Sequence, residues 1–287
     1  MNTTRSDRST TWLIYNGASG SHDDAALNAL VEAMGRAGHP PANVLDCKDG
    51  TPGAADADAA GIGLIAVHGG DGTLSRTIGG LEGFSGAVLP LPGGTYNLLA
   101  RDIFGDRDPL AIVGMLGEGR LHPMRRTCIR GRDTLALAEL LAGPGAKWAD
   151  VREELRDANI GEVISKGWDA AANSTVGPMV ALTEPPAGRE EGYAGVRLVP
   201  RPQGISIDGY AAEGLGDYVQ QGIAILRRDF REGPHDELGE ARRVALRSLD
   251  GDSMALMIDG ERSEGAAEQV FSLDTLKVDL LGIADGR

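Results

Sequence analysis

Several short segments rich in glycine, carboxylate and amide residues carry the groups that can do chemistry. One reads GGDGT at 69–73, where an apolar run at 64–67 ends at three glycines around Asp71. Glycines let a ligand approach the main chain, and the N–H groups at a helix start favour an anion such as phosphate. Asp71 would repel phosphate unless a divalent cation lay between them. The segment therefore predicts a metal and nucleotide site, with a plain glycine-rich turn as the alternative.

Two further segments of this kind follow apolar runs in the same half of the chain. NGASG at 16–20 follows residues 12–15, and PGGTYNLLAR at 92–101 follows residues 87–91. Strand-like runs alternate with helical patterns here, which indicates an open α/β sheet with mostly parallel strands. Ligands bind at the carboxyl ends of the strands of such sheets. We therefore expect the three glycine-bearing segments to lie together.

The elements that must position these segments follow from hydrophobic periodicity and turn residues. After residue 124 the helical alternation thins out and short β-like runs dominate, which predicts an antiparallel sheet or sandwich. In the first part we expect strands at 12–15, 44–45, 64–67 and 87–91, and helices at 23–34, 96–103 and 108–116. In the second part we expect a helix at 148–156 and strands at 179–182, 196–199, 205–207, 222–226, 244–249 and 254–258.

Composition limits the classes of partner. The net charge of the 287-residue chain is −14, which argues against nucleic acid as a partner. No apolar run approaches the roughly 18 residues that a membrane span needs, and the polar N-terminus has no signal-like apolar stretch. Cys47 and Cys128 have no metal-ligand spacing, so two free thiols in a reducing cytoplasm are expected.

Together with DGE at 259–261, the NGASG, GGDGT and PGGTYNLLAR segments resemble the diacylglycerol kinase catalytic family, which includes soluble bacterial diacylglycerol kinases and related lipid kinases. GGDGT is shared with NAD kinases, whereas PGGTYNLLAR is more specific for the lipid kinases. The resemblance implies an α/β ATP-binding domain at 1–124, completed by a returning segment at about 268–287. It also implies a β-rich lipid-binding domain at 125–267.

What the resemblance implies about chemistry is phosphoryl transfer from ATP, with Mg²⁺, to a hydroxyl of a lipid such as diacylglycerol. Glu261 is then the expected general base and Asp71 the expected metal ligand and second catalytic residue, while Asp259 could orient Glu261 or hold metal. Arg101 could pair with a phosphate or with a carboxylate. The expected nucleotide-binding residues are Asn16, Ser19, Gly69, Gly70, Gly72, Thr73, Gly93, Gly94, Thr95 and Asn97.

Partners and alternatives follow from the same resemblance. A lipid substrate implies a cytoplasmic protein that visits the membrane surface as a peripheral partner, and a homodimer is left open. An NAD kinase-like enzyme and a catalytically inactive nucleotide- or lipid-binding relative remain the alternatives. A hairpin turn with a solvated Glu261 is the alternative for DGE.

The sequence also departs from the family pattern. Gly17 stands where the family has proline, and only 207–210 and 216–218 faintly resemble its acidic second-domain segment.

Overall fold

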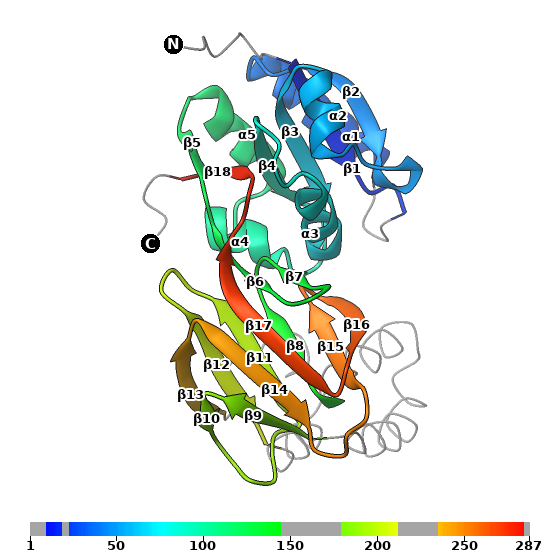
Figure 1. The fold of residues 1–287 in the computed structure, drawn as a ribbon. Helices are drawn as coiled ribbons and strands as arrows, with labels where there is room; N and C mark the ends of the chain where they lie inside the picture. Colours follow the sequence, from blue (N-terminus) through cyan, green and yellow to red (C-terminus); the bar gives the residue numbers. More distant parts are fainter. Residues whose placement is uncertain (1–9, 19–22, 145–178, 212–234, 284–287) are drawn as a thin grey trace, which may run out of the picture. The chain divides into compact units, whose positions relative to one another are not determined.

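A computed structural model of the protein describes residues 10–18, 23–144, 179–211 and 235–283. The chain divides into two compact units (Figure 1). Residues 1–127 and 275–287 form the first unit, and residues 128–274 form the second. The sequence predicts these limits at 124 and at about 268. Residues 268–272 of strand β17 pair with strand β14, so the second unit extends past 268.

The first unit is an α/β domain, as expected. Its strands are β1 (Thr10–Tyr15), β2 (Pro41–Asp46), β3 (Ile62–Gly69), β4 (Ala87–Pro92), β5 (Leu121–Met124) and β18 (Asp279–Ile283). Its helices are α1 (Asp24–Arg36), η1 (a 3₁₀ turn, Cys47–Asp49), α2 (Ala54–Ala59), α3 (Asp71–Gly80), α4 (Leu98–Phe104) and α5 (Pro109–Gly117).

The strands of the first unit form sheet A in the order β2-β1-β3-β4-β18-β5. The neighbouring strands of sheet A pair in parallel, except that β5 pairs with β18 in the antiparallel direction. The chain leaves β1 toward β2, and β3 lies on the other side of β1, so the winding direction reverses between β1 and β3. Right-handed crossovers then place α1 on one face and α2 and α3 on the other. Helix α5 packs on α1, and α4 packs beside α3, so helices cover both faces (Figure 1).

Local sequence explains where these elements begin and end. Asp23 caps α1 by accepting the N–H of Ala25 at 2.9 Å, and Asp108 caps α5 by accepting that of Ala111 at 2.8 Å. Strand β3 is buried along most of its length, which is typical of a central parallel strand covered on both faces. These local signals account for the agreement between expected and observed elements in this unit.

Within the described residues, the second unit forms two antiparallel sheets. Sheet B has the order β10-β9-β14-β17-β6-β7, and sheet C has the order β13-β12-β11-β8-β15-β16. The strands of sheet B are β6 (Thr127–Arg130), β7 (Leu135–Ala136), β9 (Val180–Glu184), β10 (Pro186–Ala187), β14 (Arg243–Ser248) and β17 (Glu268–Thr275). Those of sheet C are β8 (Leu140–Ala142), β11 (Gly195–Pro200), β12 (Ile205–Tyr210), β13 (Asp236–Ala241), β15 (Met254–Ile258) and β16 (Glu261–Gly265).

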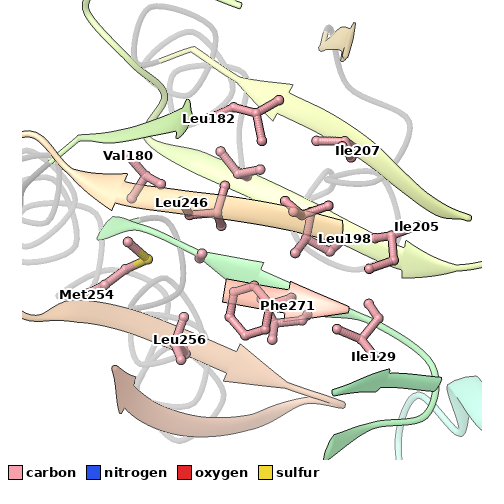
Figure 2. Close-up of a cluster of buried hydrophobic side chains, with 14 of the residues drawn as sticks. Ile129, Val180, Leu182, Leu198, Ile205, Ile207, Leu246, Met254, Leu256 and Phe271 are labelled. Atoms are coloured by element: carbon pink, nitrogen blue, oxygen red, sulfur yellow. The ribbon is translucent and has the colours of Figure 1, made fainter. Parts of the chain in front are cut away.

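One hydrophobic core holds the two sheets together (Figure 2). Every second residue of the inner strands points into it, as in Leu198 of sheet C and Leu246 of sheet B, both fully buried. Phe271 is the phenylalanine of this cluster, and its side chain has no exposed surface. The second unit is therefore the β-rich sandwich that the sequence indicated.

Some expectations concern residues outside the described ranges, namely the helix at 148–156, the strand at 222–226 and the segment 216–218. The two cysteines are free thiols, with Cys128 buried, as expected. Among the described residues, no helix is long and apolar enough to cross a membrane.

The core predicts the cost of truncating Phe271. Phe271→Ala should lower the free energy of unfolding by about 3–5 kcal/mol, because it removes a buried ring and leaves a cavity. Val270 is its neighbour on β17 but is 40% exposed, so Val270→Ala should change stability by less than about 0.5 kcal/mol. Urea unfolding followed by fluorescence measures both, and equal losses would contradict this view of the core.

Candidate functional site

The carboxyl ends of β1, β3 and β4 bring the three glycine-bearing segments of the first unit together. The three strands are neighbours and parallel, with Tyr15 beside His68 and Gly69 beside Pro92 in register. The site also lies where the winding of sheet A reverses, between β1 and β3. That position is where open α/β sheets bind ligands.

Asn16 connects the turn after β1 to the start of α3. Its side-chain Nδ2 donates to Oγ1 of Thr73 at 3.0 Å, and its Oδ1 accepts the N–H of Ala18 at 3.1 Å. Thr73 is buried in the first turn of α3. The structure therefore brings together two of the expected nucleotide-binding residues, while Ser19 lies outside the described residues.

The GGDGT segment is the junction of β3 and α3. Gly70 precedes the helix in an extended conformation, and Asp71, Gly72 and Thr73 form its first turn. The N–H groups of a first helical turn have no carbonyl partner within the helix, and the helix dipole adds positive potential there. The start of α3 is thus a suitable place for a phosphate group.

The PGGT loop before α4 is held by Asn97. Its Oδ1 accepts the N–H groups of Gly93 at 3.2 Å and Gly94 at 2.8 Å, and its Nδ2 donates to the Gly94 carbonyl at 2.8 Å. Asn97 adopts a left-handed conformation with φ 53°, which asparagine tolerates better than most residues. Asn97 therefore shapes the loop, whereas Thr95 is exposed on it.

The two glycine loops contact each other through their main chains. The N–H of Gly93 donates to the carbonyl of Gly69 at 2.9 Å. A Cβ on Gly94 would lie 2.5 Å from the Cα of Gly70, and a Cβ on Gly93 would lie 2.9 Å from the Gly69 nitrogen. No side chain fits at either position. The sequence predicts that these glycines offer N–H groups to phosphate, but the N–H groups of Gly93 and Gly94 donate within the loops.

Asp71 links the start of α3 to the start of α4. It is only 7% exposed, and its Oδ1 accepts the backbone N–H of Leu99 at 3.2 Å. The expected metal ligand therefore also fixes the spacing of two helices. Arg101, two residues farther along α4, forms an ion pair with Asp106 at 2.6 Å, so it pairs with a carboxylate.

The described residues include no group of three histidine, cysteine or carboxylate side chains placed to hold a metal ion. A Mg²⁺ ion that arrives with a nucleotide needs only one or two protein carboxylates, because phosphates and water complete its coordination. A carboxylate has about four lone-pair positions, so it can accept a backbone N–H and bind a cation together. Asp71 thus fits a magnesium–nucleotide complex as a single protein ligand.

Asp46 belongs to this edge of the sheet and was missed by the sequence analysis. It ends β2, and its Oδ1 accepts the N–H of Gly17 at 3.3 Å. Burial alone would raise the pKa of the Asp46 carboxyl, but the Lys48 ammonium and the amides of Lys48 and Gly17 hold that pKa below its usual value. The sequence signal that could have identified Asp46 is a carboxylate directly after the apolar pair at 44–45. The other signal is Gly17, which stands where the family has proline in the turn after β1.

The DGE segment lies in the second unit and forms a two-residue hairpin turn. Asp259 and Gly260 both have positive φ, 47° and 83°, and Ile258 pairs with Glu261 across the turn. The turn that the sequence left as an alternative is thus present. Glu261 opens β16 with an exposed side chain.

Asp259 differs from an ordinary turn residue because its carboxylate is buried. It is 2% exposed and accepts the N–H groups of Leu137 at 2.8 Å, Ala138 at 2.8 Å and Glu139 at 3.0 Å. Its own N–H donates to the Glu139 carbonyl at 2.9 Å. These bonds attach the hairpin that carries Glu261 to the segment before β8.

Comparisons with known proteins agree with the residues just described. Residues 10–128 match the diacylglycerol kinase catalytic domain. This match confirms the resemblance carried by the sequence motifs, and it covers every expected nucleotide-binding residue. None of the curated protein sequences matches the chain.

Solved structures show that the similarity of fold extends over both units. A diacylglycerol kinase from Bacillus anthracis str. Sterne superposes with a TM-score of 0.61 at 15% identity, over 97% of this chain and 98% of that one. A second structure from that organism, a candidate diacylglycerol kinase, gives a TM-score of 0.63 at 16% identity, over 97% of this chain and 99% of that one. At this identity the similarity establishes the fold.

The contact between the glycine loops predicts the effect of a single methyl group. Gly94→Ala should lower the free energy of unfolding by about 1–3 kcal/mol, because the new Cβ meets the Gly70 main chain. Gly80 in α3 has no atom within 4 Å of such a Cβ, so Gly80→Ala should be neutral or stabilising. Urea unfolding compares the two variants, and a Gly94→Ala protein as stable as the wild type would contradict the contact.

The buried carboxylate of the hairpin gives another prediction. Asp259→Ala should destabilise the protein by about 3 kcal/mol, because three backbone N–H groups lose their acceptor. Glu261→Ala is the matched control, since its side chain is exposed and its removal should cost less than about 0.5 kcal/mol. Thermal and urea unfolding measure both, and indistinguishable variants would show that Asp259 does not anchor the turn.

Proposed function

We propose that the protein transfers the γ-phosphoryl group of ATP to a hydroxyl of a lipid such as diacylglycerol. The observation that carries the proposal is the joining of the turns after β1, β3 and β4. The bonds Asn16–Thr73, Gly93–Gly69 and Asp71–Leu99 do this within the segment that matches the diacylglycerol kinase catalytic domain. Phosphoryl transfer depends mainly on positioning and charge neutralisation, and rigid loops of this kind supply positioning.

In this proposal the start of α3 receives the phosphates of the nucleotide, with Gly70, Gly72 and Thr73 offering main-chain and hydroxyl groups. Asn97 contributes by holding the second loop against the first. Asp71 holds Mg²⁺, which supplies charge neutralisation at the phosphate oxygens. Gly93 and Gly94 let the second loop lie against the first, because a Cβ at either position would meet the main chain of Gly69 or Gly70.

Glu261 is the proposed general base. An exposed carboxylate on a fixed hairpin can accept the proton of the lipid hydroxyl as its oxygen replaces ADP at the γ-phosphorus. Asp259 positions that hairpin through its three backbone bonds. A lipid substrate would be met at the membrane surface by a cytoplasmic protein.

The test is a transfer assay with radiolabelled ATP, Mg²⁺ and vesicles containing single lipids, with diacylglycerol first. Asp71→Asn keeps an oxygen that can accept the Leu99 N–H but removes the charge, and Glu261→Gln removes the base. We expect each to lower kcat by about 10²–10⁴-fold. Glu261→Gln should leave the affinity for Mg·ATP unchanged.

Two conservative variants at other positions show whether the loss of any one carboxylate lowers transfer. Glu32 is an exposed side chain on α1, and Glu264 lies on the opposite face of β16 from Glu261, so Glu32→Gln and Glu264→Gln are the two variants. Both should retain wild-type transfer. Absence of transfer to every lipid, together with identical behaviour of wild type and Asp71→Asn, would refute the lipid kinase proposal. Formation of NADP from NAD in a parallel assay would favour the NAD kinase-like alternative.

A further inference from the structure

The turn after β1 is held by a carboxylate from the next strand of the sheet. Oδ1 of Asp46 accepts the N–H of Gly17 at 3.3 Å, and Asp46 lies beside Tyr15 in the register of β1 and β2. The Asp46 side chain is only 5% exposed. The carboxylate is therefore a fixed part of the sheet edge.

Asp46 is itself held in place by the residues that follow it. The N–H of Lys48 donates to Oδ1 of Asp46 at 3.1 Å, and Nζ of Lys48 lies 3.0 Å from Oδ2. Charge-assisted bonds of this kind are shorter and stronger than neutral ones. Both carboxylate oxygens thus have protein partners, which favours a positioning function over ligand binding.

Gly17 and Asp46 are sterically matched. A Cβ on Gly17 would lie 2.3 Å from Oδ2 of Asp46, so the carboxylate occupies the space of a side chain at 17. A proline at 17 would meet the same obstacle and would also lack the N–H that Asp46 accepts. Glycine alone leaves a turn with high conformational freedom. The carboxylate therefore supplies the restriction that a proline ring would otherwise give.

A hydrogen bond connects the restricted turn to the start of α3. Gly17 follows Asn16, whose Nδ2 donates to Oγ1 of Thr73. A connected path runs from Asp46 through Gly17 and Asn16 to Thr73, in the first turn of the helix proposed to receive the phosphates. We infer that Asp46 is a positioning residue that holds the Asn16 turn in place for the nucleotide. This inference rests on the proposed function.

The test is a double-mutant cycle of Asp46→Ala and Gly17→Pro, read by calorimetric titration with Mg·ATP. Asp46→Ala frees the turn, so the dissociation constant should rise about tenfold, as expected for ordering one residue on binding. Gly17→Pro alone should weaken binding at least as much, because the ring meets the Asp46 carboxylate. The double variant removes the obstacle and restricts the turn again, so binding should return to within about threefold of wild type.

A second measurement reports on the turn without any ligand. The ¹⁵N order parameter of the Ala18 amide should be near 0.85 in wild type and in the double variant, and should fall below about 0.6 in Asp46→Ala. Asp49→Ala removes an exposed carboxylate three residues from Asp46 and is the matched control. It should leave both the order parameter and the affinity unchanged.

The outcomes separate the inference from the proposed function. If wild type binds Mg·ATP but Asp46→Ala binds equally well with an ordered Ala18, the positioning function of Asp46 is overturned. Additive losses in the double variant would overturn it as well, because a pure positioning residue allows rescue. If wild type does not bind Mg·ATP, the proposed function fails, and the order parameters still decide whether Asp46 fixes the turn.

Discussion

The close approach of two main-chain segments is the constraint on which the site of the first unit depends. Gly69 at the end of β3 and Gly70 after it lie against Gly93 and Gly94 after β4. A Cβ on Gly93 would come within 2.9 Å of the facing main chain, and a Cβ on Gly94 within 2.5 Å. A parallel pair of strands brings the two turns side by side, but only glycines let them touch. The Gly93–Gly69 hydrogen bond then extends the strand pairing past the end of the sheet. The start of α3 and the start of α4 are positioned by this contact.

Buried carboxylates act as anchors for the backbone at three separate turns. Asp71 accepts the N–H of Leu99, Asp46 accepts that of Gly17, and Asp259 accepts three consecutive N–H groups before β8. A carboxylate is a strong acceptor in surroundings with little water, so each bond restrains a turn that its own sequence would leave mobile. A single acidic residue of a motif can thus serve both structure and chemistry. For Asp71 the two uses are compatible, because a carboxylate has about four lone-pair positions and can accept a backbone N–H while it binds a metal.

Agreement between expected and observed elements is close in the first unit and weaker in the second. Buried parallel strands such as residues 64–67 and capped helices such as α5 leave local signals, because burial and capping act on neighbouring residues. Strands β13 and β16 were missed because they form the two edges of sheet C and carry mainly charged or polar side chains. Charged edges protect a sheet from pairing with other chains, and they also remove the alternation that identifies a strand. The hairpin at 259–260 was foreseen as an alternative, but the burial of Asp259 was not.

By itself, the sequence determined the α/β character of the first unit, the glycine-bearing turns at the carboxyl ends of its strands and the β-rich character of the second unit. These properties follow from local composition, spacing and periodicity. Only the tertiary structure decided which partner each polar side chain has: Asn16 with Thr73, Asp46 with Gly17, and Asp259 with residues 137–139. These partners are 57, 29 and 120–122 residues apart in the chain. Sheet register and turn geometry bring them within hydrogen-bond distance, and neither is encoded by any single segment.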